Sequence, residues 1–136
     1  MKHDHLILIP GALVFALAGV PALCQYTPAD LPALDAEGLE RQLKSGTWLI
    51  VEFGGRTCIP CRRMQPTLLE LQARFRDKAV VRNFWIQESP GTARRYRVML
   101  MPTQVIFDPS GREVLRHEGF WDQAAFLGAL RAKGLP

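Results

Sequence analysis

Two hydrophobic patterns occur in the middle of this chain. The run Trp48–Phe53 is apolar at nearly every position, and a short run without alternation is typical of a β-strand buried on both faces. After it, apolar residues recur at steps of four, three and four from Met64 to Phe75, which predicts an amphipathic helix packed on a sheet. Pro66 lies within this helix and removes a backbone hydrogen bond, so we expect a kink there.

Shorter segments predict the remaining elements. The Asp-Pro-Ser-Gly sequence at 108–111 joins two apolar segments, as expected for a β-hairpin. The other expected elements are a helix over 35–44, strands over 79–86, 104–107 and 113–116, a short helix over 90–97 and a final helix over about 122–133. Strands that alternate with helices predict an α/β fold: a central mixed β-sheet with parallel βαβ crossovers, a C-terminal β-hairpin, and helices on both faces.

The first residues of the chain have the pattern of a secretory signal peptide. An uncharged apolar run at 6–20 follows a short segment with one lysine, and small residues lie near Ala22. The run is shorter than the roughly 20 residues that a membrane-spanning helix needs, so cleavage is favoured, while an uncleaved anchor remains an alternative. We therefore expect a signal peptide at 1–24, an extended lead-in at 25–34 and one domain at 35–136.

Cys24 stands at the end of this leader. Cleavage after Ala22 leaves it as an odd thiol, and cleavage after Cys24 leaves two cysteines. Lipid attachment is disfavoured because Leu23 puts bulk where lipoprotein signals carry a small residue. Export implies a periplasmic or other extracytoplasmic location, where neighbouring thiols close into a disulfide unless electrons are supplied.

The composition fits one folded domain with a reactive cysteine pair. Of 136 residues, 48% are hydrophobic and 22% are charged, which argues against a disordered tail and against a disulfide-dense mini-protein. The 17 Lys+Arg and 13 Asp+Glu give a net charge of +4, but the arginines are interleaved with acids, so no nucleic-acid partner is expected. Three cysteines are too few for a disulfide scaffold, so we expect a reactive or ligating pair.

The sequence Cys58-Ile59-Pro60-Cys61 lies between the first predicted strand and the long helix. A thiol at a helix N-terminus faces unpaired backbone N–H groups and the positive end of the helix dipole, which favour the thiolate. We therefore expect Cys58 to be the nucleophile. Cys61, about one turn further into the helix, is expected to attack a mixed disulfide on Cys58 and release the reduced partner.

Two other interpretations of this pair remain. A structural disulfide across so small a loop adds little stability. A zinc site needs two more ligands, and His117 is the only histidine outside the leader. The interpretation favoured by the residues is a redox dithiol with no metal and no cofactor beyond its own disulfide.

Glu52 is an ionisable residue inside the otherwise apolar first strand. Burial raises the pKa of such a carboxyl unless a partner supports its charge. A surface position at the strand end, or a pair with an arginine, is the alternative explanation for this residue.

From about residue 35 to its end, the chain resembles the thioredoxin superfamily. Glu52 stands six residues before the first cysteine, where family members carry a buried acid, and Pro66 stands eight residues after it, at the position of their helix-kinking proline. The segment 90–96 resembles a thioredoxin segment, Met101-Pro102-Thr103 stands at the family's cis-proline position, and Gly119 matches the glycine after the last strand. Together with the leader, these motifs resemble an exported, periplasmic thioredoxin-like protein with a Cys-Ile-Pro-Cys active site.

This resemblance implies roles for residues around the pair. In the family, the cis peptide bond at Met101-Pro102-Thr103 exposes the backbone of Met101, on which an extended client segment pairs as an added strand. Ile59 and Pro60 then form the rim of the same client-binding site. Glu52 lies behind the pair and accepts the proton that Cys61 must lose before it attacks.

The chain also departs from the family pattern. Gly54 and Thr57 stand where cytoplasmic thioredoxins carry aromatic residues, so the docking surface is altered. Asn83 stands where a strand lysine lies near the buried acid, so proton coupling around Glu52 differs. Phe120, like other apolar residues near Met101, fits a buried core more readily than a docking surface.

The direction of electron flow is inferred from Pro60. It occupies the place where strongly oxidising members carry a histidine, so we expect a monomer that reduces disulfides of client proteins. Its electrons are expected from a membrane transporter of the DsbD/CcdA type. Net disulfide oxidation is one alternative, and a non-catalytic binding or copper-carrier module with the cysteines as soft ligands is another.

Overall fold

Strand β1 (Trp48–Gly54) lies at the centre of the structure, a computed structural model that describes residues 30–135. It pairs in parallel with β2 (Ala79–Trp85) and antiparallel with β3 (Thr103–Phe107). β4 (Glu113–Glu118) pairs antiparallel with β3, so the strand order is β2-β1-β3-β4. Because β1 has a strand on each side and helices on both faces, its residues after Trp48 are buried, as the apolar run predicts.

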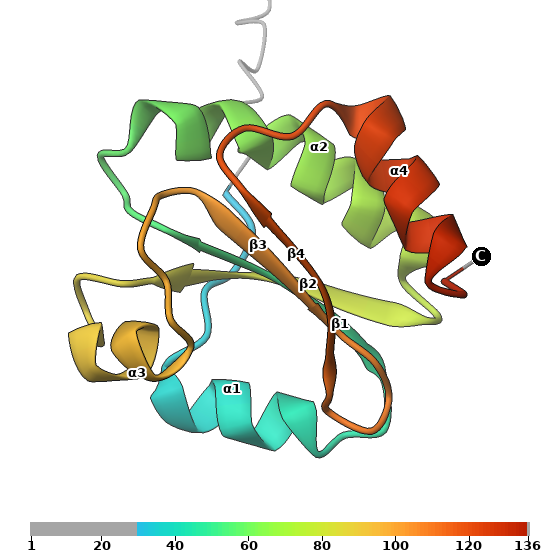
Figure 1. Cartoon of the computed structure of the whole chain (residues 1–136), viewed down its shortest axis with the longest axis horizontal. Helices are drawn as coiled ribbons and strands as arrows, with labels where there is room; N and C mark the ends of the chain where they lie inside the picture. Colours follow the sequence, from blue (N-terminus) through green and yellow to red (C-terminus); the bar gives the residue numbers. More distant parts are fainter. Residues whose placement is uncertain (1–29, 136) are drawn as a thin grey trace, which may run out of the picture.

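Helices cover both faces of this sheet (Figure 1). α2 (Ile59–Phe75) and α4 (Gln123–Ala132) lie on one face, and α1 (Ala36–Leu43) and α3 (Pro90–Arg95) lie on the other. The α/β fold with a mixed sheet, a β3–β4 hairpin and two covered faces is therefore confirmed. Among the described strands, the unit β1–α2–β2 is the one parallel crossover, because β3 runs antiparallel to both of its neighbours.

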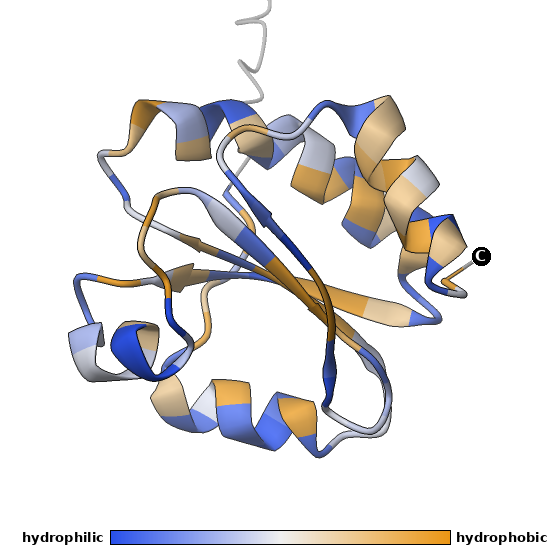
Figure 2. Cartoon of the chain, viewed as in Figure 1, coloured by the Kyte–Doolittle hydropathy of each residue, from blue (hydrophilic) through white to orange (hydrophobic). Residues whose placement is uncertain are grey.

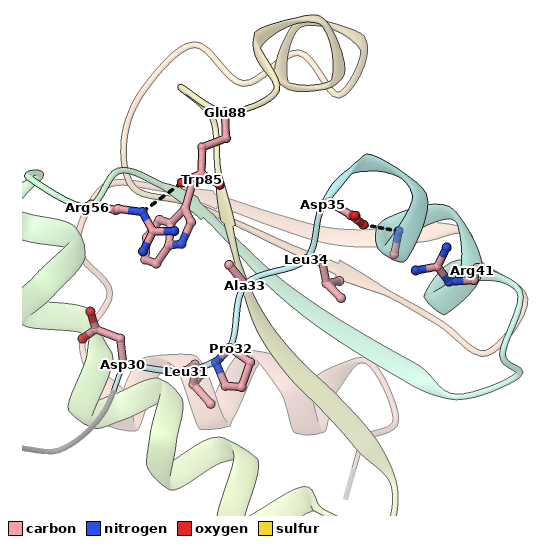
Figure 3. A pocket seen from close by; sticks show the side chains of 11 residues that line it. Asp30, Leu31, Pro32, Ala33, Leu34, Asp35, Arg41, Arg56, Trp85 and Glu88 are labelled. Carbon is pink, nitrogen blue, oxygen red and sulfur yellow. Dashed lines mark hydrogen bonds and ion pairs between the residues drawn. The ribbon is translucent and has the colours of Figure 1, made fainter.

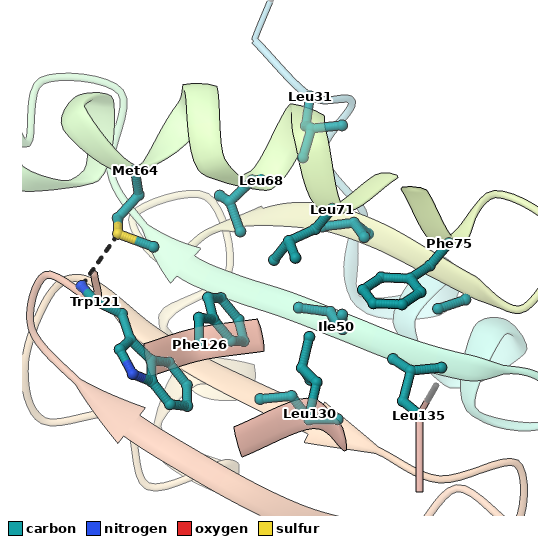
Figure 4. Close-up of a cluster of buried hydrophobic side chains, with 13 residues drawn as sticks. Leu31, Ile50, Met64, Leu68, Leu71, Phe75, Trp121, Phe126, Leu130 and Leu135 are labelled. Atoms are coloured by element: carbon teal, nitrogen blue, oxygen red, sulfur yellow. Dashed lines mark hydrogen bonds between the residues drawn. The ribbon is translucent and has the colours of Figure 1, made fainter. Parts of the chain in front are cut away.

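Two apolar layers separate the sheet from its helices. Figure 2 shows α1 with its hydrophobic residues toward the sheet, where they join the layer under α1 and α3. The layer under α2 and α4 contains the side chains that the helical periodicity predicts to face inward (Figure 4), namely Met64, Leu68, Leu71 and Phe75. In the same layer, the ring of Phe126 stacks on that of Trp121 with 4.1 Å between centroids. Trp121, at the start of the last helix, is thereby fixed against the core.

Helix α2 leads away from the end of β1. Pro66 lies inside it, and Figure 1 shows the helix changing direction between its first and last turns. The helix nevertheless continues to Phe75, because its inward side chains bury against the sheet over the whole length. Its first turn is thus held at a defined place relative to β1.

The lead-in is extended, as expected, but it belongs to the packed domain. Leu31 is buried in the layer under α2, and Ala33 forms a parallel bridge with Asn83 on the outer edge of β2. The N–H of Asn83 donates to the carbonyl of Pro32 at 3.1 Å. Residues 31–33, which precede the expected start at Asp35, thus pack with the domain, and pairing through the backbone leaves no pattern in the side chains.

The expected signal peptide at 1–24, and residues 25–29 of the lead-in, lie outside the described residues. None of the helices between residues 30 and 135 combines the length and the apolar character that a bilayer-spanning segment requires.

Candidate functional site

The disulfide between Cys58 and Cys61 lies at the first turn of α2. A turn after β1, closed by the N–H of Cys58 on the carbonyl of Gly55 at 3.1 Å, delivers Cys58 to the N-cap of the helix. The backbone N–H of Cys61 donates to the Cys58 sulfur at 3.3 Å. Because the unpaired N–H groups of a helix start favour negative charge, this sulfur lies where a thiolate is stabilised, as its position in the sequence predicts.

The two sulfurs differ in their access to solvent. Cys58 is half-buried, whereas Cys61 is 1% exposed and lies beneath the first turn of α2. A protein partner can therefore reach Cys58 first. Cys61 is placed to react with whatever is bound to Cys58, which is the division of labour expected from the sequence.

Gly54 ends β1 directly below the disulfide. A Cβ at this position would lie 3.0 Å from the Cys61 sulfur and 3.4 Å from Oε1 of Glu52. The hydrogen of glycine leaves room for both groups, so the carboxyl and the inner sulfur border the same small space. Gly54, which departs from the aromatic residue of cytoplasmic thioredoxins, thus permits this close approach.

Glu52 is fully buried, so the alternative surface position is wrong. The pKa of its carboxyl is raised from 4.5 to about 8: burial raises it most, the Gln104 amide lowers it in part, and the charge of Asp30 raises it further. Among residues 30–135, no arginine pairs with Glu52, and neither of its oxygens completes a hydrogen bond of ordinary geometry, including with Gln104. The carboxyl is therefore mostly protonated at neutral pH, with the carboxylate as the minor form.

Asn83 lies beside Glu52 on β2, at the place of the family's lysine. Its amide is engaged elsewhere: Nδ2 donates to the carbonyl of Leu31 at 2.8 Å, and Oδ1 accepts from Nε2 of Gln65 at 3.0 Å. Oε1 of Gln65 in turn accepts from the N–H of Leu31 at 3.1 Å. This neutral network ties the lead-in to α2 and brings no positive charge to Glu52.

The peptide bond between Met101 and Pro102 is cis and immediately precedes β3. Thr103 pairs with Phe53, near the end of β1, so this loop lies at the same end of the sheet as the disulfide. The hydroxyl of Thr103 donates to the carbonyl of Leu100 at 2.7 Å. Pro102 and Thr103 are buried while Met101 is half-buried, so of these three residues Met101 is the one that remains partly accessible.

Exposed apolar side chains occur in the segments around the site. The exposed fraction is 71% for Ile59, 50% for Leu100 and 46% for Phe120. Phe120 is thus not a core residue, although its ring lies under the Arg63 guanidinium, 5.1 Å from the centroid. Pro60, beside Ile59, is half-buried. The sequence identified Ile59, but exposure of Leu100 and Phe120 depends on how the loops are placed.

Gln104 was not identified from the sequence. It is fully buried on β3 and lies directly opposite Glu52 in the register of β1 and β3. The sequence did carry a signal, because Gln104, like Glu52, is a lone polar residue in an otherwise apolar strand. Its significance becomes visible only once the pairing of the two strands is known.

A cavity of about 550 Å³ lies beside the turn that leads to Cys58 (Figure 3). The lead-in forms one wall, and the Arg56 side chain forms another through its ion pair with Glu88 at 2.8 Å and its place over the Trp85 ring. Neither cysteine lines this cavity, so it is distinct from the disulfide site. In the part of the chain that the structure describes, no group of three or more His, Cys, Asp or Glu residues is arranged to hold a metal ion.

Comparison with known proteins gives consistent matches. The Thioredoxin family model matches residues 31–132. Thioredoxins of Staphylococcus aureus strains Mu50, MW2 and N315 are each 36% identical over 99 residues, which covers 73% of this chain and 86% of theirs. The match thus begins at Leu31, in agreement with the packing of the lead-in.

Glu52→Gln is expected to remove a loss in the free energy of unfolding that the wild type suffers as the pH rises. In the wild type, the folded state keeps the Glu52 proton up to a pKa of about 8, while the unfolded state releases it near the ordinary pKa of 4.5. The contribution of this carboxyl to the free energy of unfolding is therefore full below pH 4.5 and is lost as the pH rises to about 8. The loss is on the order of a few kcal/mol.

Urea unfolding at several pH values, from about 4 to about 9, measures this effect. Relative to the wild type, Glu52→Gln should gain stability as the pH rises. Glu70→Gln is the control because Glu70 is exposed on α2. Parallel pH dependences for the wild type and Glu52→Gln would contradict the assignment of a neutral buried carboxyl.

Proposed function

The chain belongs to the thioredoxin family, and we propose that it is an exported thiol–disulfide oxidoreductase that reduces disulfide bonds of client proteins through Cys58 and Cys61. The observation that carries this proposal is the arrangement of the pair. A half-buried sulfur at the start of α2 is bonded to a buried sulfur and accepts a backbone N–H at 3.3 Å.

The proposed reaction has two displacement steps. The Cys58 thiolate attacks one sulfur of a client disulfide, a mixed disulfide forms, and the other client sulfur leaves as a thiolate that takes up a proton. In molecules whose Glu52 is ionised, the minor form at neutral pH, Cys61 then gives its proton to the Glu52 carboxylate and attacks the Cys58 sulfur. The bond between Cys58 and the client breaks, the client has gained two electrons, and the Cys58–Cys61 disulfide remains.

The proposed client site extends from the disulfide to the cis-proline loop. An extended client segment pairs with the backbone of Met101 as an added strand, and Pro102 and Thr103 fix the shape of the loop beneath it. Ile59 and Pro60 form the opposite rim. The high exposure of Ile59 supports this role, because an apolar side chain in solvent gains free energy when a partner covers it.

We propose that the protein acts in the periplasm or another extracytoplasmic compartment and is directed there by residues 1–24. In an oxidising compartment the pair stays closed unless a donor reduces it. A membrane transporter of the DsbD/CcdA type is therefore the proposed donor. Pro60 before the second cysteine supports the reducing direction, because a histidine at that place would further stabilise the thiolate form.

Net oxidation of clients is the second candidate. The N–H of Cys61 that activates the Cys58 sulfur also stabilises the reduced form, and that shift favours oxidation of other proteins. The two candidates use the same residues, so the reduction potential decides between them.

Cys58→Ser is expected to abolish the catalysis of insulin reduction by dithiothreitol, a loss on the order of a hundredfold or more in the catalysed rate, because the attacking sulfur is absent. Cys61→Ser should slow turnover. When the reduced variant is mixed with insulin in the absence of dithiothreitol, a Cys58–insulin mixed disulfide should accumulate, seen as a mass increase that reductant removes. Cys24→Ser is the matched control and should retain full activity. An inactive wild type would refute the proposed function.

The Cys58–Cys61 couple is expected to have a reduction potential below about −200 mV, in the range of thioredoxins and glutaredoxins. Equilibration with glutathione buffers, followed by alkylation and mass spectrometry, measures the oxidised fraction. A value above about −150 mV would rule out the reducing role and support net oxidation.

Export is expected to yield a chain that begins after residue 22 or 24 and fractionates outside the cytosol. Cell fractionation and N-terminal mass analysis test this expectation. Replacing Leu13 and Leu17 by arginine places charge in the apolar run and should leave the full-length chain in the cytosol. A wild-type chain that stays intact in the cytosol would refute export.

A further inference from the structure

Four polar residues form a row across the sheet, on the face that α2 and α4 cover. Asn83 of β2 pairs in register with Glu52 of β1, Glu52 with Gln104 of β3, and Gln104 with His117 of β4. The first three are fully buried, whereas His117 is half-buried and stacks on Trp121 with 4.2 Å between centroids. Residues directly opposite on antiparallel strands have their Cβ atoms about 5 Å apart, so Gln104 and Glu52 are side by side.

Glu52 and Gln104 are the members of this row whose polar atoms remain without partners. In residues 30–135, neither carboxyl oxygen of Glu52 and neither polar atom of the Gln104 amide has a hydrogen-bond partner. Asn83, on the other side of Glu52, is already bonded to Leu31 and Gln65. A buried polar group without a hydrogen-bond partner costs free energy of folding. A carboxyl and an amide that both lack partners and lie opposite each other therefore point to a hydrogen-bonded pair that forms during the reaction.

An amide suits a carboxyl that changes its protonation state. The protonated carboxyl has an O–H that donates to Oε1 of glutamine, and the carboxylate has oxygens that accept from Nε2–H. Rotation of the amide about its last side-chain bond exchanges these two arrangements. An apolar side chain at the same position offers neither.

We propose that Gln104 is a positioning residue that holds the Glu52 carboxyl toward Cys61 in both of its protonation states. This inference rests on the proposed function, in which Glu52 takes the proton that Cys61 loses. Before the transfer, Nε2–H of Gln104 donates to the Glu52 carboxylate. Once the carboxyl has taken the proton of the Cys61 thiol, the amide turns and Oε1 accepts the new O–H. Glu52 later returns the proton to solvent.

Among the groups around Glu52, the Gln104 amide is the one that stabilises its negative charge. The titratable groups near Glu52 are Cys61 from α2, Asp30 from the lead-in and, one strand beyond Gln104, His117 from β4. Burial raises the pKa of the carboxyl most, and the charge of Asp30 raises it further, while Gln104 lowers it. Gln104 therefore acts in the direction of the carboxylate that the proton transfer from Cys61 requires.

Gln104→Leu tests the proposal. The pKa of Glu52, followed by carbon NMR of the carboxyl, should rise by about one unit, because a hydrogen bond to the charged form is lost. Release of client from the Cys58 mixed disulfide should become about tenfold slower at neutral pH, since less Glu52 is ionised. The midpoint of urea unfolding should not fall, because the substitution removes two unpaired buried polar atoms.

Gln65→Leu is the matched control. It also replaces a buried glutamine beneath the same helix, but one that bonds Asn83 and Leu31. This variant should lose stability and leave the Glu52 titration where it is in the wild type. In a Glu52→Gln background, Gln104→Leu should have no further effect on the pH profile of client release.

An unchanged Glu52 titration and an unchanged release rate in Gln104→Leu would overturn the proposal. If that variant does not fold, Gln104→Met, which keeps the length of the side chain, is titrated in the same way. A wild type that reduces no disulfide refutes the proposed function instead. The shift of the Glu52 titration by Gln104→Leu then still decides whether the two side chains pair.

Discussion

The site depends on one local arrangement, in which the N–H of Cys61 in the first turn of α2 donates to the sulfur of Cys58. This contact requires β1 to end at a fixed place, the turn through Gly55 to be tight, and α2 to be held on the sheet by its inward side chains. The reactivity of the Cys58 sulfur, the more accessible of the two, thus depends on the whole β1–α2 unit.

Behind the sulfurs, neutral groups occupy positions where charges would be expected. Within residues 30–135, Glu52 is buried without a cation beside it. Asn83 and Gln65 bond each other and the lead-in, and Gln104 contributes an amide. Such an interior raises the pKa of the carboxyl, so that once ionised it readily takes a proton from a nearby thiol. The proton acceptor and its environment are therefore tuned by burial and amides rather than by salt bridges.

Local patterns were sufficient for the elements and for the cysteine pair. The continuous apolar run of β1 and the periodicity of α2 identify both elements, and the position of Cys58 between them identifies the helix start. Glu52 is recognisable because it interrupts an apolar run. Non-local pairing was not predictable: Gln104 gains its meaning from the register of β1 and β3, and the lead-in joins the domain through backbone bonds to Asn83.

The lead-in has a further consequence for the outer edge of β2. By bridging Asn83 it occupies backbone groups that would otherwise be open to strand addition by another molecule, while Leu31 fills a place in the core. Proteolytic trimming up to Asp35 would uncover both the strand edge and the hydrophobic gap. The shortened domain would then be prone to aggregation, so its solubility depends on a few residues that precede its first helix.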